Sequence, residues 1–419
     1  MMMRLLDTVV GPSPLTPGYT RITARIIMDD GKELPIWVDV PDEFADDISD
    51  SGNPWLIAML PMAAARHENI QLSLPVDTFL LENLRGVSKI WAGWYPDLRE
   101  VAIDCSTYSS IESLRPEKHA AFFSGGIDSF YTIARRLPGN GIGLPVVGQL
   151  DDLISVWGFD VSANDEANFT PKANGLTSAA KNINRKHVII RTNLRDNQSA
   201  WFRRWGPLTN GAGLSFIALV LEKRYRQVVL GSSYPNYSYV PWGSHPLVDP
   251  LFSTSATQVV HDGASATRVA KTDMVAKFPP AQAELHVCLA LAASNCSQCE
   301  KCYRTMITLD ILGQKQVMGR VFDWSKYQVS AIRKIKIGGK GDRAYYDEIL
   351  DAARAAGRHD ISRELESAGT RSRMLAPALR TSEWLMQQPL LWRVGMAIKK
   401  FVLRDAITAA YIKHSSDKS

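Results

Sequence analysis

Two short segments of this chain carry residues whose types and spacing could do chemistry. The first is Ser124-Gly125-Gly126-Ile127-Asp128-Ser129, and the second holds the cysteines between Cys288 and Cys302. Glycine lets backbone N–H groups approach a ligand closely because no Cβ lies in the way. Thiolates at short spacing are common ligands of a closed zinc site. The two segments therefore predict a phosphate-binding loop and a metal site.

The residues on either side of the two glycines predict where the loop lies. Residues 120–123 form a short apolar run typical of a buried strand, and residues 128–137 carry apolar side chains at helical spacing. The turn thus joins a strand to the start of a helix, where N–H groups and the helix dipole attract anions. The hydroxyls of Ser124 and Ser129 add donors. An ordinary strand-to-helix turn with a capping serine is the alternative interpretation.

The cysteines follow the pattern Cys288-x7-Cys296-x2-Cys299-x2-Cys302. Two overlapping C-x-x-C steps bring three sulfurs together through a tight turn, and the fourth comes from the preceding segment. Four thiolates suit a structural zinc ion with no open position for water. An iron–sulfur cluster and disulfides are the alternatives, and a reducing compartment disfavours the disulfides. Cys105 lies far from the group, and we expect a buried thiol there.

Residues 116–315 alternate strand and helix, which is the pattern of an α/β domain with a parallel sheet. We expect further strands at 153–160, 187–192 and 227–233. Ligands of such sheets bind outside the carboxyl ends of the strands. The polar and small residues at those ends that we expect to contact a nucleotide are Gly158, Asp160, Gly231 and Ser232. A loop or helix-capping aspartate is the alternative for Asp160.

Two further segments of this region carry candidate site residues. The aromatic and proline-rich loop at 234–249 is long enough to be functional, and in it we expect Trp242, His245 and Asp249 to meet a substrate. Arg268 and Lys271 lie three residues apart, so they share one helical face and could reach phosphates. A solvated, charged helix start is an equally good interpretation of this pair.

The regions on both sides predict additional domains. Residues 1–115 are expected to form a β-rich accessory domain with a hairpin of 19–28 and 33–40, and with strands at 87–94 and 100–104. Residues 316–419 lose the strand pattern and predict a helical region. We find no catalytic constellation in the first region. Either region could offer a surface to a protein partner, and the chain could also form a homodimer.

The segment Ser124-Gly-Gly-Ile-Asp-Ser129 resembles the SGGxDS loop of the PP-loop ATP pyrophosphatases. That resemblance implies an adenine nucleotide alpha hydrolase-like (HUP) domain, ATP and Mg²⁺ as cofactors, and cleavage of ATP to AMP and pyrophosphate. Together with the four cysteines, the loop is similar to that of the 7-cyano-7-deazaguanine synthase family. This implies a structural Zn²⁺ and adenylation of 7-carboxy-7-deazaguanine, first to an amide and then to a nitrile. The resemblance covers about 200 of the 419 residues.

One segment departs from that family. A Tyr-Pro-Asp-Cys-Arg segment follows the fourth strand in the family, whereas residues 238–246 read Ser-Tyr-Val-Pro-Trp-Gly-Ser-His-Pro here. A changed recognition segment indicates a changed substrate, which we expect to be a small-molecule or protein-bound acid. A loop that folds differently but reads the same heterocycle is the alternative interpretation. In the resulting mechanism Ser124–Ser129 hold the leaving pyrophosphate. Asp128 fixes the loop or binds Mg²⁺, and Lys271 or Arg268 balances developing charge.

Two other functions fit the same residues. A PP-loop sulfurtransferase that thiolates tRNA would need reactive cysteines, and a non-catalytic nucleotide-binding subunit would need no acceptor. The net charge of +5 is spread along the chain and is too weak to indicate a nucleic-acid partner. No apolar run approaches the length of a membrane span, and the first residues lack the apolar core of a signal peptide. With few cysteines, most of them in one group, we expect a cytoplasmic protein.

Overall fold

The computed structural model describes residues 1–109, 116–139, 148–196, 201, 203–235, 240–288, 291, 293–338, 340–387 and 391–402. The chain divides into two compact units. The first consists of Met1–Ser124 and Asp128–Ser265, and the second of Gly125–Ile127 and Ala266–Ser419. The first unit therefore joins residues from the two regions that we predict as separate domains on either side of residue 115.

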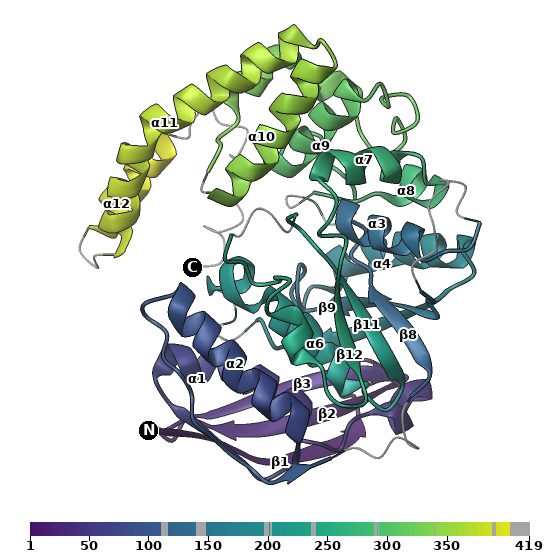
Figure 1. Cartoon of the computed structure of the whole chain (residues 1–419), viewed down its shortest axis with the longest axis vertical. Coiled ribbons are helices and arrows are strands. Elements are labelled where there is room, and N and C mark those ends of the chain that lie inside the picture. Colours follow the sequence, from purple (N-terminus) through teal and green to yellow (C-terminus); the bar gives the residue numbers. More distant parts are fainter. Residues whose placement is uncertain are drawn as a thin grey trace. The chain divides into compact units, whose positions relative to one another are not determined.

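A ten-stranded sheet runs through the first unit, in the order β12-β11-β8-β9-β10-β3-β2-β1-β4-β6 (Figure 1). Its strands are β1 Met2–Pro12, β2 Tyr19–Ile27, β3 Glu33–Pro41, β4 Asn69–Leu72, β6 Ile103–Asp104, β8 Lys118–Phe122, β9 Asp152–Trp157, β10 Lys186–Thr192, β11 Tyr225–Gly231 and β12 Gln258–Asp262. A small second sheet pairs β5 (Val76–Asp77) with β7 (Thr107–Tyr108).

Strands β12, β11, β8, β9 and β10 pair in parallel, which confirms the α/β class with a parallel sheet. Counted from β8 in chain order, their arrangement is 3-2-1-4-5. The chain passes from β8 to β9 and β10 on one side, and then returns to place β11 on the other side of β8. Ligands of doubly wound sheets bind where the strand order reverses in this way. The carboxyl ends of β8 and β11 mark this position.

Helices cover both faces of the parallel strands because successive side chains of a strand point to opposite faces. On one face, Ile154 and Ile190 belong to a large apolar core with α6 (Asn210–Val220) and α1 (Asn53–Arg66). On the other, Trp157 and Ile189 pack with Phe169 and Ala173 of α4 (Glu166–Asn182). Helix α3 (Ile127–Arg135) directly follows β8. Trp55 of α1 packs edge-on against Phe216 of α6 at a ring centroid distance of 5.5 Å.

The N-terminal hairpin is confirmed as β2 and β3, and it extends the parallel sheet. Strand β3 pairs antiparallel with β10, and the Thr192 hydroxyl donates to the Trp37 carbonyl at 2.7 Å. The strand predicted at 87–94 is wrong, because these residues belong to helix α2 (Thr78–Trp94). Val87 and Trp91 are both buried, and this spacing of four places them on one helical face. Asp77 caps α2 by accepting from the N–H groups of Phe79 and Leu80.

The second unit is helical in its described part, as predicted for residues beyond 316. Its helices are α7 Arg268–Ala276, α8 Pro279–Glu284, α9 Glu300–Ile311, α10 Lys340–Ala355, α11 His359–Gln387 and α12 Trp392–Val402. A core that includes Tyr303, Ile307, Tyr346, Ile349 and Leu365 joins α9, α10 and α11. Among the described residues of both units, no helix is long and apolar enough to cross a membrane.

Candidate functional site

The predicted phosphate loop connects a strand to a helix. Strand β8 ends at Phe122 and α3 begins at Ile127. Gly125 has a φ of 81°, a left-handed conformation that favours glycine, and its carbonyl accepts from the His286 N–H at 2.8 Å. The Ser124 hydroxyl is 3.5 Å from that of Ser129, which is buried in the first turn of α3. The segment thus has the strand–turn–helix form that an anion site at a helix start requires.

The glycines at the neighbouring strand ends allow close backbone approach. A Cβ at Gly231 would lie 2.9 Å from the Asp128 carbonyl oxygen, so a larger residue would displace α3 or β11. A Cβ at Gly158 would lie 1.9 Å from the Thr192 carbonyl oxygen, and φ there is 118°. These contacts give both glycines a structural reason, and a nucleotide contact at either one stays a prediction.

The polar residues predicted at the same rim have other contacts. The Ser232 hydroxyl donates to the Tyr234 carbonyl at 2.6 Å, and its N–H donates to the Asp262 carbonyl at 2.7 Å. The Asp160 side chain is exposed and lies 3.4 Å from the Lys172 ammonium. Nucleotide binding by Ser232 and Asp160 therefore also stays a prediction.

A chain of side-chain hydrogen bonds holds the strand end that leads into the loop. The Ser155 hydroxyl donates to the Phe123 carbonyl at 2.5 Å and lies 2.8 Å from Nε2 of His187. Nδ1 of His187 lies 2.7 Å from the Thr177 hydroxyl. Burial lowers the pKa of His187 to about 4, because the enclosed ring is poorly hydrated when charged. The imidazole is therefore neutral at pH 7.

This pKa predicts a pH-dependent stability of the first unit. Between pH 6.5 and pH 4 the unfolded chain binds a proton at His187 that the folded chain does not, so stability rises with pH across this window. The free energy of unfolding can be measured with urea at pH 7.5 and at pH 5. His187 should contribute about 2 kcal/mol to it at pH 7.5, and this contribution should be lost at pH 5. His187→Asn should remove this part of the pH dependence. The control His67→Asn, at an exposed histidine of the same unit, should keep the pH dependence of the wild type. If the stability of His187→Asn changed with pH as steeply as that of the wild type, His187 would not be its source.

In the predicted substrate loop, the structure brings Asp249 and His245 together. Asp249 is fully buried and accepts from the Ser244 hydroxyl at 2.6 Å, the His245 N–H at 3.1 Å and Nδ1 of His261 at 2.7 Å. Asp249 thus positions its neighbours, and direct contact between its carboxylate and a substrate stays a prediction.

The two ring side chains predicted to meet a substrate, His245 and Trp242, pack against aromatic side chains. The His245 ring meets Trp94 edge-on at a centroid distance of 4.9 Å, and burial lowers the pKa of His245. Trp242 packs edge-on against Tyr234 at 5.5 Å. Residues 236–239 of the same loop lie outside the described residues. Aromatic packing holds both rings in place, as a recognition surface requires.

The two predicted cations lie on α7 in the second unit. Lys271 is 1% exposed, so the interpretation of a solvated helix start is wrong for this side chain. The Arg268 guanidinium lies over the Tyr345 ring at 5.0 Å and donates to the Tyr345 hydroxyl at 3.3 Å. The Arg268 N–H donates to a carboxylate oxygen of Glu348 at 2.7 Å. Contact of either cation with phosphate stays a prediction.

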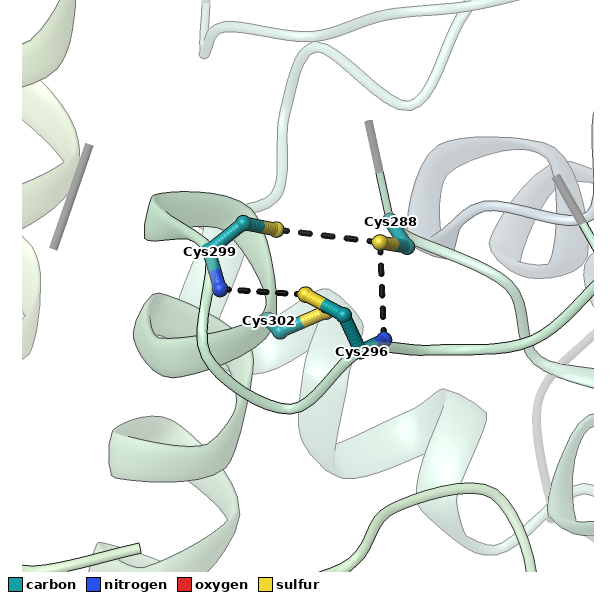
Figure 2. Close-up of side chains that lie close together, drawn as sticks. All are labelled: Cys288, Cys296, Cys299 and Cys302. Atoms are coloured by element: carbon teal, nitrogen blue, oxygen red, sulfur yellow. Dashed lines mark hydrogen bonds between the residues drawn. The ribbon is translucent and has the colours of Figure 1, made fainter. Parts of the chain in front are cut away.

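The four cysteine sulfurs lie together, within 4.8 Å of one another (Figure 2). Cys288 and Cys299 are 3.9 Å apart at Sγ, as are Cys296 and Cys302. A tetrahedral zinc ion with Zn–S bonds of about 2.3 Å separates its sulfurs by about 3.8 Å. The group could therefore bind a metal ion such as zinc.

The backbone around the cysteines also suits thiolates. N–H groups of Cys296 and Cys299 point at the sulfurs of Cys288 and Cys296, at 3.5 and 3.2 Å (Figure 2). Hydrogen bonds from the other thiols hold the pKa of Cys288 well below its usual range, whereas those with Cys288 raise the pKa of Cys302 far above it. Four adjacent thiols cannot all ionise without a cation, and a divalent ion would stabilise all four thiolates.

Two residues that contact the candidate site residues were not predicted from the sequence. Asn295 accepts from the N–H groups of Val287 and Cys288 at 2.9 and 3.2 Å and donates to the carbonyls of Leu285 and Val321. It therefore fixes the segment that carries Cys288, and its place next to Cys296 was the available signal. His261 was missed because the short strand β12 was not predicted.

Fold and site together define an α/β protein with a glycine-rich strand–helix turn at the reversal of its parallel sheet and a four-cysteine group that could bind a metal. No family model, no curated protein and no solved structure matches the chain.

Proposed function

We propose that this protein is a PP-loop ATP pyrophosphatase of the HUP class that adenylates a carboxylate or amide for carbon–nitrogen bond formation. The observation that carries the proposal is the Ser124–Ser129 turn between β8 and α3, at the reversal of the strand order. Nucleotides of doubly wound sheets bind at this position, and the N-terminus of a helix stabilises phosphate charge.

The chain's own residues have distinct roles in this proposal. The backbone N–H groups and hydroxyls of Ser124–Ser129 hold the phosphates of ATP and orient the α-phosphate towards the attacking acid. Asp128, in the first turn of α3, fixes the loop or holds Mg²⁺. Arg268 and Lys271 neutralise the charge of the leaving pyrophosphate. Mg²⁺, when bound, supplies further charge neutralisation.

Cys288, Cys296, Cys299 and Cys302 are proposed to bind one structural Zn²⁺. The spacing of their sulfurs fits a tetrahedral ion, and four sulfur ligands leave no position for a reacting water. A cytoplasmic location is part of the proposal because thiolates persist there. Iron with labile sulfide in the purified protein would instead favour the tRNA-thiolating alternative.

For the substrate, we propose an acid other than free 7-carboxy-7-deazaguanine, or the same acid carried by a larger molecule. Support comes from the loop at 240–249, where Trp242 and His245 are held by aromatic contacts in place of an Asp-Cys-Arg segment. Binding sites that hydrogen-bond a substrate discriminate strongly, because unpaired buried polar groups cost about 1–3 kcal/mol each. A changed set of groups therefore changes the preferred ligand.

The test incubates the protein with ATP, Mg²⁺, ammonium and 7-carboxy-7-deazaguanine, and resolves the nucleotide products. Where this acid is turned over, AMP and pyrophosphate are the expected products, because the loop is proposed to bind the leaving β- and γ-phosphates together. Absence of turnover agrees with an altered substrate. ADP and inorganic phosphate would contradict the PP-loop assignment. Efficient formation of the free nitrile would contradict only the altered substrate, and would leave the adenylation chemistry in place.

A further inference from the structure

A serine, an aspartate and a histidine meet at the carboxyl end of β12 in the first unit. His261 is the next-to-last residue of β12 and lies opposite Leu230 of β11. Its Nδ1 lies 2.7 Å from Oδ2 of Asp249, which also accepts from the Ser244 hydroxyl at 2.6 Å. The side chains of His261 and Asp249 are 3% and 0% exposed. The cluster thus occupies the end of the sheet where ligands of such folds bind.

The carboxylate fixes the orientation and the tautomer of the imidazole. Asp249 is itself held, because its second oxygen accepts from the His245 N–H at 3.1 Å. A Cβ at Gly211 would lie 2.3 Å from that oxygen, so only glycine lets α6 start so close to the carboxylate. Since Nδ1–H donates to Asp249, Nε2 carries the lone pair in the neutral ring.

Nε2 of His261 is buried, and it has no hydrogen-bond partner among the described residues. A buried polar atom without a partner costs free energy, and a catalytic role is one explanation for such an atom. A metal ion would need several ligands. Among the described residues, the group of three or more side chains that could hold a metal ion is that of the four cysteines, and His261 is not part of it. A ligand N–H or O–H is therefore the partner that this atom fits.

We propose that His261, oriented by Asp249, is the general base for the amine that attacks the acyl adenylate, an inference that rests on the proposed function. The amine nitrogen forms a bond to the carbonyl carbon, and the bond from that carbon to the AMP oxygen breaks. AMP leaves with the electron pair of the broken bond. The proton released by the nitrogen moves to Nε2, and the imidazolium is stabilised by the Asp249 carboxylate.

The experiment separates adenylation from transfer in His261→Gln. Enzyme, ATP and 7-carboxy-7-deazaguanine are mixed without ammonium, and the burst of pyrophosphate is measured; ammonium is then added, and amide formation is followed. Where the wild type gives a burst with this acid, the variant should keep the burst and lose amide formation by about 10²- to 10⁴-fold. Its remaining rate should lose the pH dependence that the wild type shows in this step. The control Gln258→Ala, an exposed residue of the same strand, should keep both steps.

Amide formation at the wild-type rate in His261→Gln would overturn the inference. If the wild type gives no pyrophosphate with this acid, as an altered substrate predicts, a second measurement decides about His261. In protein labelled with ¹⁵N-histidine, its Nε2 should be unprotonated and Nδ1 protonated in the resting state. A protonated Nε2 would overturn the inference whatever the pyrophosphate assay shows.

Discussion

Cys299→Ser should lower the metal content from one zinc per chain to almost none and unfold part of the second unit. Structural zinc contributes on the order of 10 kcal/mol to the folding of small zinc modules, because the site forms only in the folded chain. Cys302, its close neighbour in the group, lies on α9, and the next residue, Tyr303, belongs to the core of this unit. Loss of the metal therefore releases the end of a helix on which that core depends.

Metal analysis and thermal unfolding with and without a chelator measure this effect. The chelator should lower the unfolding temperature of the wild type and leave that of Cys299→Ser unchanged. Cys105→Ser is the matched control, because Cys105 lies in the first unit, and it should retain both zinc and the response to chelator. Zinc at one equivalent in Cys299→Ser, or an unfolding temperature equal to the wild type, would contradict a structural site.

Ser124→Ala should reduce pyrophosphate release by about 10²- to 10³-fold, the usual effect of losing one aligned donor, and Gly231→Ala should also reduce it strongly by misplacing the loop. Ser124→Ala removes a hydroxyl at the start of the loop. Gly231→Ala places a methyl group 2.9 Å from the Asp128 carbonyl oxygen, so the first turn of α3 has to move. The two variants alter the same proposed phosphate site, one by removing a donor and the other by moving the backbone.

Pyrophosphate release is measured at saturating and at subsaturating ATP, which separates a lower maximal rate from weaker binding of ATP. Gly93→Ala is the control for the second variant, because a Cβ at Gly93 of α2 meets nothing within 4 Å. It should keep the wild-type rate and fold. Circular dichroism and unfolding by urea should show that Ser124→Ala is as stable as the wild type. Normal pyrophosphate release by both loop variants would show that nucleotide phosphates bind elsewhere.

The features that the sequence predicted well depend on short-range patterns. The turn at Gly125 and the cysteine group depend on residues close together in the chain, whose spacing decides how near their atoms can come. The β2–β3 hairpin likewise forms between neighbouring segments. In these cases, local geometry was enough to predict the arrangement.

Other features depend on contacts that no local pattern reveals. Residues 87–94 are rich in β-branched and aromatic side chains, but packing of Val87 and Trp91 into the core favours a helix. The Asp249–His261 pair joins a loop to a strand of only five residues, Gln258–Asp262, which is too short to show a clear alternation. The environment of Lys271 could not be predicted, because burial of a charged side chain depends on tertiary packing.

The pairing of β3 with β10 sets an order of events during synthesis. Strands β1 to β3 can pair with one another as soon as they leave the ribosome, because their contacts are local. The outer edge of β3 can pair only after β10 has been synthesised. The hydrogen bond from Thr192 to Trp37, for example, joins residues that are 155 positions apart in the sequence. Until then, the nascent chain exposes a strand edge that can pair with other chains, and it is most prone to aggregation in this interval.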